Sequence, residues 1–515
     1  MAIGLAIPQA MNIDRRRFLA LGGLSAAWIS APACIRPRPE MRVLPSLAPI
    51  PEPFTVVLPI PPVARPVRTD PITDFYEMDV RAASVRILPA LDTVIWGYGG
   101  IFPGPTIEAR KGRRVSVLLR NRLPAPIVSH LHGGRTAPES DGYPTDLVLP
   151  AGGYPKPHMH DPLARIAAGQ REYIYENDQR GATLWYHDHR MDFTGAQVWR
   201  GLAGFYLIRD EEEERLPLPR GDREIPLMIC DRSFDADGSL RYPAARGDEP
   251  GVLSEYSGGV MGDVILVNGA PWPRVEVANV RYRFRILNAS NARRYELALD
   301  PMPPHGAAFV QIGSDGGLLA APVTHRSIRI APAERFDVII DFSQFRTGTS
   351  VKLVNRAGVG RAGEVMRFDV ARTERDDSTI PGRLSEISML YSPQAVVTRE
   401  FDFGYQRLGC GWTINGKAFD PARMDARPLL NAAEIWRLKT DFNHPLHLHL
   451  THFLVLSHSG RPTPRDSGWK DTIDLGPGQA ASILVKFAGY RGRYVFHCHN
   501  LEHEDMGMMA NFEVV

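Results

Sequence analysis

Hydrophobic residues in this chain recur mostly at every second position, in short runs that Gly, Pro, Asn and Asp interrupt. Residues 114–121, Arg-Val-Ser-Val-Leu-Leu-Arg-Asn, form one such run, and residues 282–288, Tyr-Arg-Phe-Arg-Ile-Leu-Asn, form another. Successive side chains of a strand point to opposite faces, so this spacing is typical of strands that bury one face. Helical periodicity is scarce along the chain. The pattern therefore predicts an all-β protein.

A faint internal repeat divides the chain into three parts. In each part a turn leads into an alternating run, and the three pairs are 102–107 with 114–121, 267–273 with 282–288, and 414–419 with 434–439. A chain of 515 residues is long enough for about three domains, each with its own core. We expect three Greek-key β-sandwich domains, over residues 70–210, 224–372 and 384–515.

Three further segments are expected to lie before or between these domains. Residues 211–223, acidic with proline, and residues 373–383, polar with Pro and Gly, are predicted junctions. The run Glu211 to Glu214 is compatible with a cation site, but a solvated linker face is the favoured interpretation. Residues 34–69 are rich in proline and lack periodicity, so we expect a leader that wraps the first domain.

The first 33 residues are expected to be a targeting segment rather than part of the fold. Three arginines at 15–17 precede a moderately apolar stretch, and small residues at 31–33 offer a cleavage site. This arrangement resembles a twin-arginine signal peptide, and its apolar stretch is too short to span a membrane. We therefore expect export to the periplasm or the extracellular space. Cys34 leaves a lipoprotein anchor open, although the residues before it match a lipobox poorly.

Composition and charge narrow the classes of partner. With 44% hydrophobic and 23% charged residues the composition is that of a globular protein, and the formal net charge is +2. Nothing in this balance favours nucleic acid or an anionic membrane as a partner. Two of the four cysteines, Cys230 and Cys410, are expected to be buried free thiols, although export would permit a disulfide between them.

The densest chemistry lies in residues 497–508 near the C-terminus. If this segment begins as a strand, His497 and His499 point to one side and Cys498 to the other. A thiolate, imidazoles and a thioether are ligands that copper favours. Cys498, His503 and Met508 would therefore make a copper site for electron transfer, provided that another histidine arrives from elsewhere in the chain.

Three more histidine groups share the spacing of ligands on one strand face. They are His130 with His132, His187 with His189, and His447 with His449, the last preceded by His444. The flanking residues of the first two groups are apolar, aromatic or β-branched, which favours strands.

The remaining histidines are not expected to bind metal. His158 and His160 have the same spacing, but Gly and Pro flank them, which indicates a loop that cannot hold two rings rigidly. His305, His325, His452 and His458 are single, and a surface or satisfied core histidine is the favoured interpretation of each.

Together the four groups resemble the multicopper oxidases. The matching motifs are His-Leu-His-Gly at 130–133, Trp-Tyr-His-Asp-His at 185–189, His-Pro-Leu-His-Leu-His at 444–449, and the long motif at 497–508. The sequence resembles the bacterial three-domain branch with laccases, bilirubin oxidases and phenoxazinone synthases. The resemblance implies cupredoxin-like domains, four copper ions, and a trinuclear cluster where the first and third domains meet, with the middle domain mainly a spacer and a wall on the substrate side.

The resemblance also implies a ligand set. The type 1 copper would be bound by His444, Cys498, His503 and Met508. The type 2 copper would be bound by His130 and His447, and the type 3 pair by His132, His187, His189, His449, His497 and His499. Cys498 would then carry electrons to the cluster through the backbone of its two histidine neighbours.

Reduction of dioxygen to water also needs protons, so acids are expected near the cluster. Glu504 and Asp141 match acidic positions of the family and are candidates for this role. Either could instead orient an imidazole or be a solvated loop acid.

The expected activity is one-electron oxidation of phenols, aromatic amines or related small organic donors, with dioxygen as acceptor, by a protein that is expected to be a monomer. An oxidase of cuprous, ferrous or manganous ions is the alternative. Copper-detoxifying members carry a methionine-rich insert, whereas the fifteen methionines here are dispersed except near Met508. A degenerate scaffold without catalysis is disfavoured because no expected ligand is missing, and a simple electron-transfer protein would not need the other eight histidines.

Overall fold

The computed structural model describes residues 39–154, 161–245, 251–387, 397–406 and 411–515. Strands make up nearly all of its regular structure, which confirms the all-β prediction. The expected signal peptide, Cys34, the His158 and His160 pair, and Cys410 lie outside the described residues. None of the described helices is long and apolar enough to cross a bilayer.

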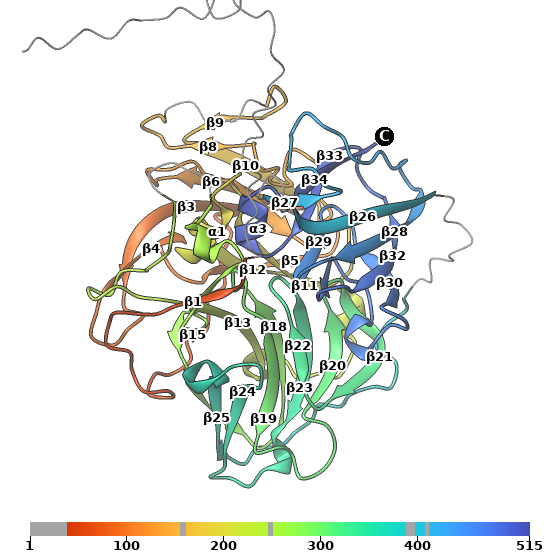
Figure 1. The fold of residues 1–515 in the computed structure, drawn as a ribbon. Helices are drawn as coiled ribbons and strands as arrows, with labels where there is room; N and C mark the ends of the chain where they lie inside the picture. The colour runs from red at the N-terminus through yellow and green to blue at the C-terminus, as the bar shows by residue number, and fades with distance from the viewer. Residues whose placement is uncertain (1–38, 155–160, 246–250, 388–396, 407–410) are drawn as a thin grey trace, which may run out of the picture.

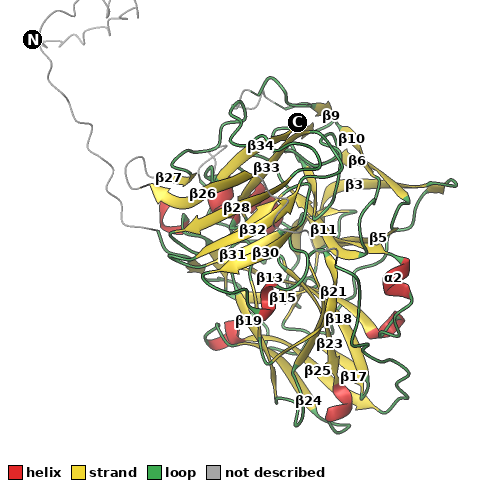
Figure 2. Ribbon diagram, turned by 90° about the vertical axis from the view of Figure 1, so that its right-hand side faces the viewer, coloured by secondary structure: helices red, strands yellow, loops and turns green. Residues whose placement is uncertain are grey.

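The sheets fall into three groups along the chain, in agreement with the expected three sandwiches. In Figure 1 the middle group lies below, while the first and third groups lie side by side above it. Figure 2, turned by a quarter, shows the strands of the second group, among them β18 and β23, below those of the third. Each group contains its own cluster of buried apolar side chains, and that of the second group extends into the first.

The first group has sheets of order β10-β6-β3-β2, with β4 beside β3, and β5-β12-β11-β7, and a small β8-β9 pair. In β6 the residues Val115, Val117 and Leu119 are buried, as the alternation predicts. The strands are β2 (Arg68–Thr69), β3 (Thr73–Val85), β4 (Thr93–Tyr98), β5 (Gly104–Arg110), β6 (Arg114–Asn121), β7 (Ser129–His132), β8 (Val148–Leu149), β9 (Ala167–Ala168), β10 (Gln170–Tyr175), β11 (Ala182–Asp188) and β12 (Ala203–Arg209).

The second group has sheets of order β16-β15-β13-β18-β23-β20-β21 and β17-β25-β24-β19-β22. The strands are β13 (Glu224–Arg232), β14 (Val260–Gly262), β15 (Val264–Val267), β16 (Ala270–Pro271), β17 (Arg274–Ala278), β18 (Arg281–Asn288), β19 (Tyr295–Asp300), β20 (Phe309–Ser314), β21 (Gly317–His325), β22 (Ile328–Ile330), β23 (Arg335–Asp341), β24 (Ser350–Asn355) and β25 (Glu364–Arg372). The alternation in β18 predicts one solvated face, but Arg283 and Arg285 on that face are only 1% exposed, because ion pairs cover them.

The third group has sheets of order β27-β26-β28-β32-β30 and β31-β29-β33-β34. The strands are β26 (Val397–Gln406), β27 (Gly411–Ile414), β28 (Ala433–Thr440), β29 (His444–Leu448), β30 (Phe453–His458), β31 (Thr472–Leu475), β32 (Ala480–Lys486), β33 (Gly492–Cys498) and β34 (Met509–Val514). The helices of the described residues are short: α1 (Thr194–Trp199), α2 (Glu211–Glu214) and α3 (Leu501–Asp505), besides single turns of 3-10 helix at 221–223, 254–256, 342–344, 360–363 and 464–466.

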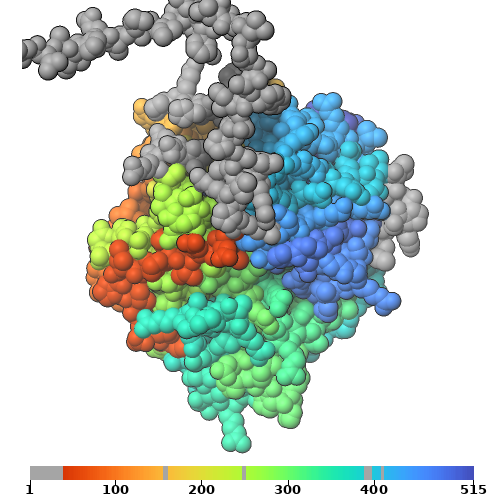
Figure 3. Space-filling model, viewed as in Figure 1, coloured from red at the N-terminus to blue at the C-terminus, as the bar shows by residue number. Residues whose placement is uncertain are grey.

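The leader contacts a different domain from the one expected. Its strand β1 (Arg42–Leu44) pairs with β14 of the second group, and further on Leu58 donates its backbone N–H to Arg274. Only from about residue 62 does it reach the first group, where Ala64 bonds to Thr106. Figure 3 shows this segment, in red, lying on the surface against the green and teal atoms of the second domain. The prediction therefore holds only for the end of the segment, where β2 pairs with β3, and is wrong for the part before it. Unpaired N–H groups of an irregular segment bond to any available strand edge, which periodicity cannot reveal.

The acidic run at the first junction is not simply a solvated face. Asp210 caps helix α2 by accepting from the backbone N–H of Glu213, and this turns the Glu213 side chain inward, where it is 5% exposed. Glu211 on the same helix stays exposed and pairs with Arg215. The buried carboxylate of Glu213 contacts Arg283 at 3.1 Å, which offsets the cost of removing it from water.

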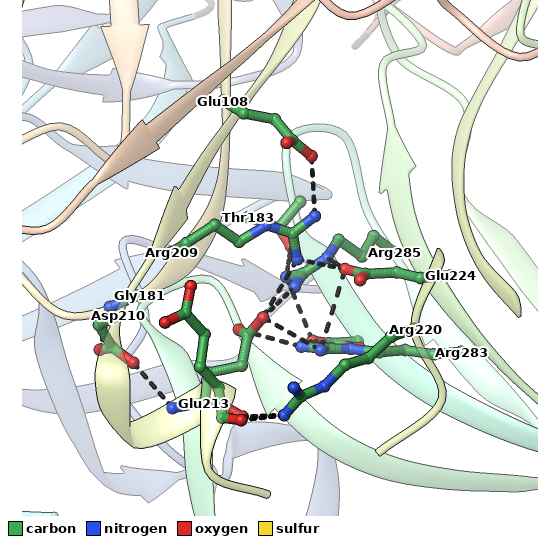
Figure 4. A network of polar contacts seen from close by, with 12 residues as sticks. Glu108, Gly181, Thr183, Arg209, Asp210, Glu213, Arg220, Glu224, Arg283 and Arg285 are labelled. Carbon is green, nitrogen blue, oxygen red and sulfur yellow. Dashed lines mark hydrogen bonds and ion pairs between the residues drawn. The ribbon is translucent and has the colours of Figure 1, made fainter. Parts of the chain in front are cut away.

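Figure 4 shows the group to which Glu213 belongs. We call it the arginine–carboxylate network, and its members are Arg209, Arg283, Arg285, Glu213, Glu224 and Asp337. It joins the end of the first domain to strands β18 and β23 of the second.

Candidate metal centre

Pairing between strands brings the histidine groups into register. In the first domain β7 runs antiparallel to β11, with His130 opposite His187. In the third domain β29 runs antiparallel to β33, with His447 opposite His497. Figure 1 shows that β11 and β29 lie where these two domains meet. The sheets therefore present histidines from both domains to one shared space.

Eight histidines, which lie on these four strands or directly after their ends, form one buried cluster. Ring nitrogens of its members lie within 4.8 Å of one another in three groups. The groups are His130, His132 and His447; His132, His187 and His499; and His189, His449 and His497. We call the eight residues the histidine cluster, and all of them are at most 2% exposed. The pairs expected at the type 2 and type 3 coppers thus come together as the resemblance implies.

In one group the ring nitrogens face one another at close range. His497 Nε2 lies 3.2 Å from the Nε2 atoms of both His189 and His449. Burial lowers the pKa of all three rings, that of His189 to about 3, so the rings are neutral. His497 Nδ1 donates to the carbonyl of Cys498 at 3.0 Å, so this nitrogen carries the proton of its ring, while His449 Nδ1 lies 2.8 Å from a carboxylate oxygen of Asp141. The unprotonated Nε2 of His497 therefore faces the Nε2 atoms of the other two rings, an arrangement that a metal ion satisfies.

The second group repeats this design. His187 Nδ1 donates to the carbonyl of Asp188 at 2.8 Å. Among the described residues, His187 Nε2, His132 Nδ1 and both ring nitrogens of His499 are buried without a hydrogen-bond partner. Buried polar atoms nearly always have a partner, so a missing partner at three neighbouring rings fits a site at which these nitrogens bind a metal ion. Trp185 stacks on His187 with 4.2 Å between ring centroids and closes this side of the cluster.

The last pair bridges the two domains. His130 Nε2 and His447 Nε2 are 3.4 Å apart, while their Nδ1 atoms bond outward to the backbone carbonyls of Asp141 and Asp471 at 2.5 and 2.9 Å. Both rings are thus oriented by main-chain atoms, with one Nε2 from each domain left to face a shared ligand.

The second site lies on the other side of β33, as the alternation of this strand predicts. Cys498 Sγ is 3.3 Å from His444 Nδ1 and 3.6 Å from His503 Nδ1. Met508 is fully buried in the same core, and its carbonyl accepts from the Cys498 N–H at 3.1 Å. We call these four residues the mononuclear site. Burial raises the pKa of the Cys498 thiol, so thiolate formation here needs a bound cation.

Helix α3 and an aromatic ring position His503. The helix follows β33 directly, and this places His503 back over the strand that carries Cys498. Trp412 stacks on the His503 ring with 3.7 Å between centroids, and its indole N–H donates to the carbonyl of Ser257 in the middle domain. The second domain thus touches the wall of the mononuclear site.

Both candidate acids contact the same three-histidine group from outside. Asp141 reaches His449, while Glu504 lies 3.3 Å from His497 Nδ1 and 3.7 Å from His189 Nδ1. Burial raises the pKa of each carboxyl to about 8. Neither is a solvated loop acid, because Asp141 is 0% and Glu504 2% exposed. Asp141 bonds to an imidazole, whereas Glu504 only lies close to two rings, and a proton-relay role of either acid stays a prediction.

Sequence reasoning missed two charged residues beside the cluster. Asp471 accepts from His132 Nε2 at 3.0 Å, and Arg335 of β23 holds that carboxylate with two hydrogen bonds. Burial alone would raise the pKa of Asp471, but the Arg335 guanidinium and His132 hold it well below its usual range. The only signal in the sequence was a Lys-Asp pair directly before a strand, which does not name a partner.

His325, His452 and His458 are not among the rings that converge in the histidine cluster or the mononuclear site. His325 bonds to Gln311 at 2.8 Å and His458 to Asp466 at 3.0 Å, while His452 Nε2 lies 3.8 Å from Asp471. Cys230 is a buried free thiol, and burial raises its pKa to about 11.

Imidazole, thiolate and thioether donors in these two sites fit copper. Models of the multicopper oxidase family match residues 79–213 and 391–515. A laccase of Bacillus subtilis (strain 168) is 37% identical over 90% of this chain and 98% of its own length, and a bilirubin oxidase of Albifimbria verrucaria is 36% identical over 89% of this chain and 81% of its own. The crystal structure of a laccase from Pediococcus acidilactici Pa5930 matches 92% of this chain and 96% of its own with a TM-score of 0.80 at 32% identity. The chain therefore belongs to the multicopper oxidases, and it is a copper oxidoreductase.

Proposed function

We propose that the protein is an exported laccase-like oxidase that takes electrons singly from small organic donors and uses them to reduce dioxygen to water. Copper, when bound, supplies the one-electron chemistry at both sites. The mononuclear site would hold one ion, and the histidine cluster would hold one ion between His130 and His447 and one in each remaining group. The convergence of buried ring nitrogens in the cluster, several of them without a hydrogen-bond partner among the described residues, is the observation that carries this proposal.

The backbone of β33 gives the two sites a covalent connection. Cys498 belongs to the mononuclear site, while its neighbours His497 and His499 belong to two different groups of the cluster. An electron that reaches the thiolate therefore needs to pass only through bonds of adjacent residues. Alternation of side chains along the strand creates this link, since one face carries sulfur and the other carries imidazole.

Asp141 and Glu504 are proposed to hold protons for the reduction of dioxygen. Each carboxyl is buried and contacts a histidine of the cluster, so a proton stored there is near the place of its use. Thr194 donates its hydroxyl to Glu504 Oε1 at 2.7 Å and fixes the orientation of that carboxyl.

An organic donor is favoured over a metal ion. Two of the most similar relatives are a laccase and a bilirubin oxidase. The methionines are dispersed rather than gathered in an insert of soft ligands, with Met506, Met508 and Met509 as the local exception. Oxidation of cuprous, ferrous or manganous ions is the alternative to be tested in parallel.

Export by the twin-arginine route is proposed from the arginines at 15–17 and the apolar stretch that follows. Fractionation of cells that express the full chain should place it outside the cytoplasm. Replacement of Arg15, Arg16 and Arg17 by Lys should retain it inside, and an unchanged distribution would contradict this route.

The main experiment loads the purified protein with copper, counts the ions and records the visible spectrum. Oxygen consumption is then compared with a phenol, bilirubin, cuprous ion and ferrous ion as donors. We expect a blue protein with about four copper ions per chain. It should consume oxygen faster with the two organic donors than with the two metal ions. A colourless protein with fewer ions would contradict the proposed copper sites. A protein that oxidises only metal ions would contradict the proposed organic donor.

The proton role has a matched control on the same helix. Glu504→Gln should keep the blue colour and slow oxygen reduction by about 100-fold or more. Glu502 is equally buried on α3 but bonds to Tyr242 and Asn291 rather than to a histidine. Glu502→Gln should therefore leave the rate close to that of the natural protein. Equal rates in both variants would remove Glu504 from the relay.

A further inference from the structure

Arg335, the first residue of β23, lies where all three domains meet. Its Nε–H donates to the carbonyl of Thr183 in the first domain at 3.0 Å. Its two terminal nitrogens donate to the carbonyls of Ala333 and Asp315 in the second domain at 3.0 and 3.2 Å. The same two nitrogens donate to the Asp471 carboxylate in the third domain at 2.7 and 2.5 Å. The side chain is fully buried.

These bonds use every N–H of the guanidinium. Arginine has five such donors in a fixed planar fork, and all five have an acceptor of good length here. The position of Arg335 is therefore determined from three domains at once, and the fork in turn determines the plane of the Asp471 carboxylate.

Asp471 passes this constraint to the histidine cluster. Its Oδ1 accepts from His132 Nε2 at 3.0 Å, and its backbone carbonyl accepts from His447 Nδ1 at 2.9 Å. Because a carboxylate beside a guanidinium is ionised and only accepts, His132 carries its proton on Nε2. His132 Nδ1 is then the atom that faces His187 and His499.

Gly133, the residue after His132, gives independent support. Its φ is +86°, and a Cβ there would lie 2.7 Å from an Arg335 nitrogen and 2.8 Å from Asp471 Oδ2. The backbone next to the ligand thus packs directly on the ion pair, and only glycine leaves room for it. Two features of the first domain, the His132 ring and the Gly133 backbone, are built around a pair contributed by the other two domains.

We propose that Arg335 is a positioning residue of the histidine cluster: through Asp471 it fixes the tautomer and orientation of His132, so that the middle domain takes part in holding copper. This inference rests on the proposed function, because it assigns a role toward ions that the cluster binds. It replaces the expectation that the middle domain is mainly a spacer.

A purely structural joint is the competing explanation, and the chain offers a matched control for it. Arg285 also belongs to the second domain, is 1% exposed, and donates to Thr183 Oγ1 of the first domain at 2.8 Å. Its described ion pairs are with Glu213, Glu224 and Asp337, none of which bonds to a ring of the cluster. Arg285→Lys and Arg335→Lys therefore weaken similar contacts between domains. Only Arg335→Lys also disturbs a residue, Asp471, that bonds to a histidine of the cluster.

The test measures copper rather than activity. Natural protein, Arg335→Lys and Arg285→Lys are loaded with copper, and release is followed by competition with a chelator, with the type 2 signal recorded by electron paramagnetic resonance. Lysine cannot reproduce the two-pronged contact. We expect Arg335→Lys to bind ions of the cluster about 10- to 100-fold more weakly and to change the type 2 signal, while the blue absorption of the mononuclear site remains. Arg285→Lys should keep the affinity and the signal.

A second variant guards against a failure of Arg335→Lys to fold. Gly133→Ala leaves both charges in place but pushes on the ion pair and strains the backbone beside His132, so it should lower affinity at the cluster in the same direction. Equal copper affinity and identical type 2 signals in Arg335→Lys, Gly133→Ala and the natural protein would overturn the inference. Absence of copper binding in the natural protein would instead overturn the proposed function, so the two failures are distinguishable.

Discussion

The histidine cluster and the arginine–carboxylate network are both buried polar regions at domain boundaries, and they differ in how their charges are satisfied. In the network, three guanidinium groups meet three carboxylates, for example Arg283 with Asp337 at 2.5 Å and Arg285 with Glu213 at 2.8 Å. In the cluster, ring nitrogens face one another, and nitrogens of His187 and His499 have no partner among the described residues. One region is complete as it stands, whereas the other needs cations.

This difference separates a structural joint from a functional site. Burial of a charge is costly unless a partner and hydrogen bonds offset it, and the network provides both from within the chain. Six rings of the cluster have one nitrogen bonded to Asp141, Asp471 or a main-chain carbonyl, yet nitrogens that face the centre are left for a ligand. A fully paired polar group stabilises the fold, while a group paired on one side only holds a ligand ready to bind metal.

Removal of the sulfur ligand should break the functional region and leave the structural one intact. Cys498→Ser should abolish the blue absorption and reduce turnover to background, because no other described thiol lies at the mononuclear site. The urea midpoint of the copper-free protein should change little, since serine is a close match in size. Visible spectra, oxygen consumption and unfolding curves check this, and retention of blue colour would contradict the ligand assignment.

Removal of one charge should break the structural region instead. Arg283→Met leaves Glu213 and Asp337 with fewer partners inside the protein, and we expect a loss of about 3–5 kcal/mol in the free energy of unfolding. Urea unfolding of the copper-free protein measures the loss. Copper content of the folded fraction should stay normal.

The balance of charge, rather than the number of ion pairs, is expected to set this stability. The double variant Arg283→Met with Asp337→Leu removes one charge of each sign and should be no less stable than Arg283→Met alone. A further loss comparable to the first would show that the individual contacts matter more than the balance.

The sequence predicts contacts within one strand in these two regions, but not contacts between residues that are far apart in the chain. Alternation along a single strand was enough to place Cys498 opposite His497 and His499, because the geometry of a strand is local. The contact of His132 with Asp471 spans 339 positions in sequence, and nothing near either residue indicates it. The family resemblance supplied the ligand set, but it did not supply Arg335.

The same limit explains the errors in the fold. The run Glu211 to Glu214 has the composition of a solvated linker, and Glu211 fits that expectation. Glu213 does not, because its partner Arg283 lies 70 positions away on a strand whose own alternation predicted an exposed arginine. Two charged residues, each predicted to be exposed, bury one another. A pattern read along one segment cannot detect such mutual burial.

Removal of copper should affect the region of the cluster by a smaller amount than loss of a network charge. A ligand that binds only the folded state stabilises it by about 2.7 kcal/mol when its free concentration is 100 times its dissociation constant. Chelation should therefore lower the thermal midpoint, and readdition of copper should restore it. The midpoint of Cys498→Ser should fall less on chelation, because one site is already lost; an equal fall would contradict separate contributions of the two sites.

Acid should act on the network with the smallest of these effects. The surrounding arginines lower the pKa of Glu224 to about 2 against the cost of burial, so its folded-state value lies below that of the unfolded chain. Such a carboxylate stabilises the fold fully above the unfolded pKa of about 4.3, and this contribution is lost as pH falls toward 2. Between pH 5 and 3 we expect a loss of about 1.5 kcal/mol from Glu224, measured by urea unfolding of the copper-free protein.

Two variants test whether Glu224 causes this response. Glu224→Gln should flatten the slope of the free energy of unfolding against pH, whereas Glu211→Gln, in an exposed pair with Arg215, should leave that slope unchanged. Equal slopes in the natural protein and both variants would show that the acid response arises elsewhere, and the network would then owe its stability to packing rather than to charge.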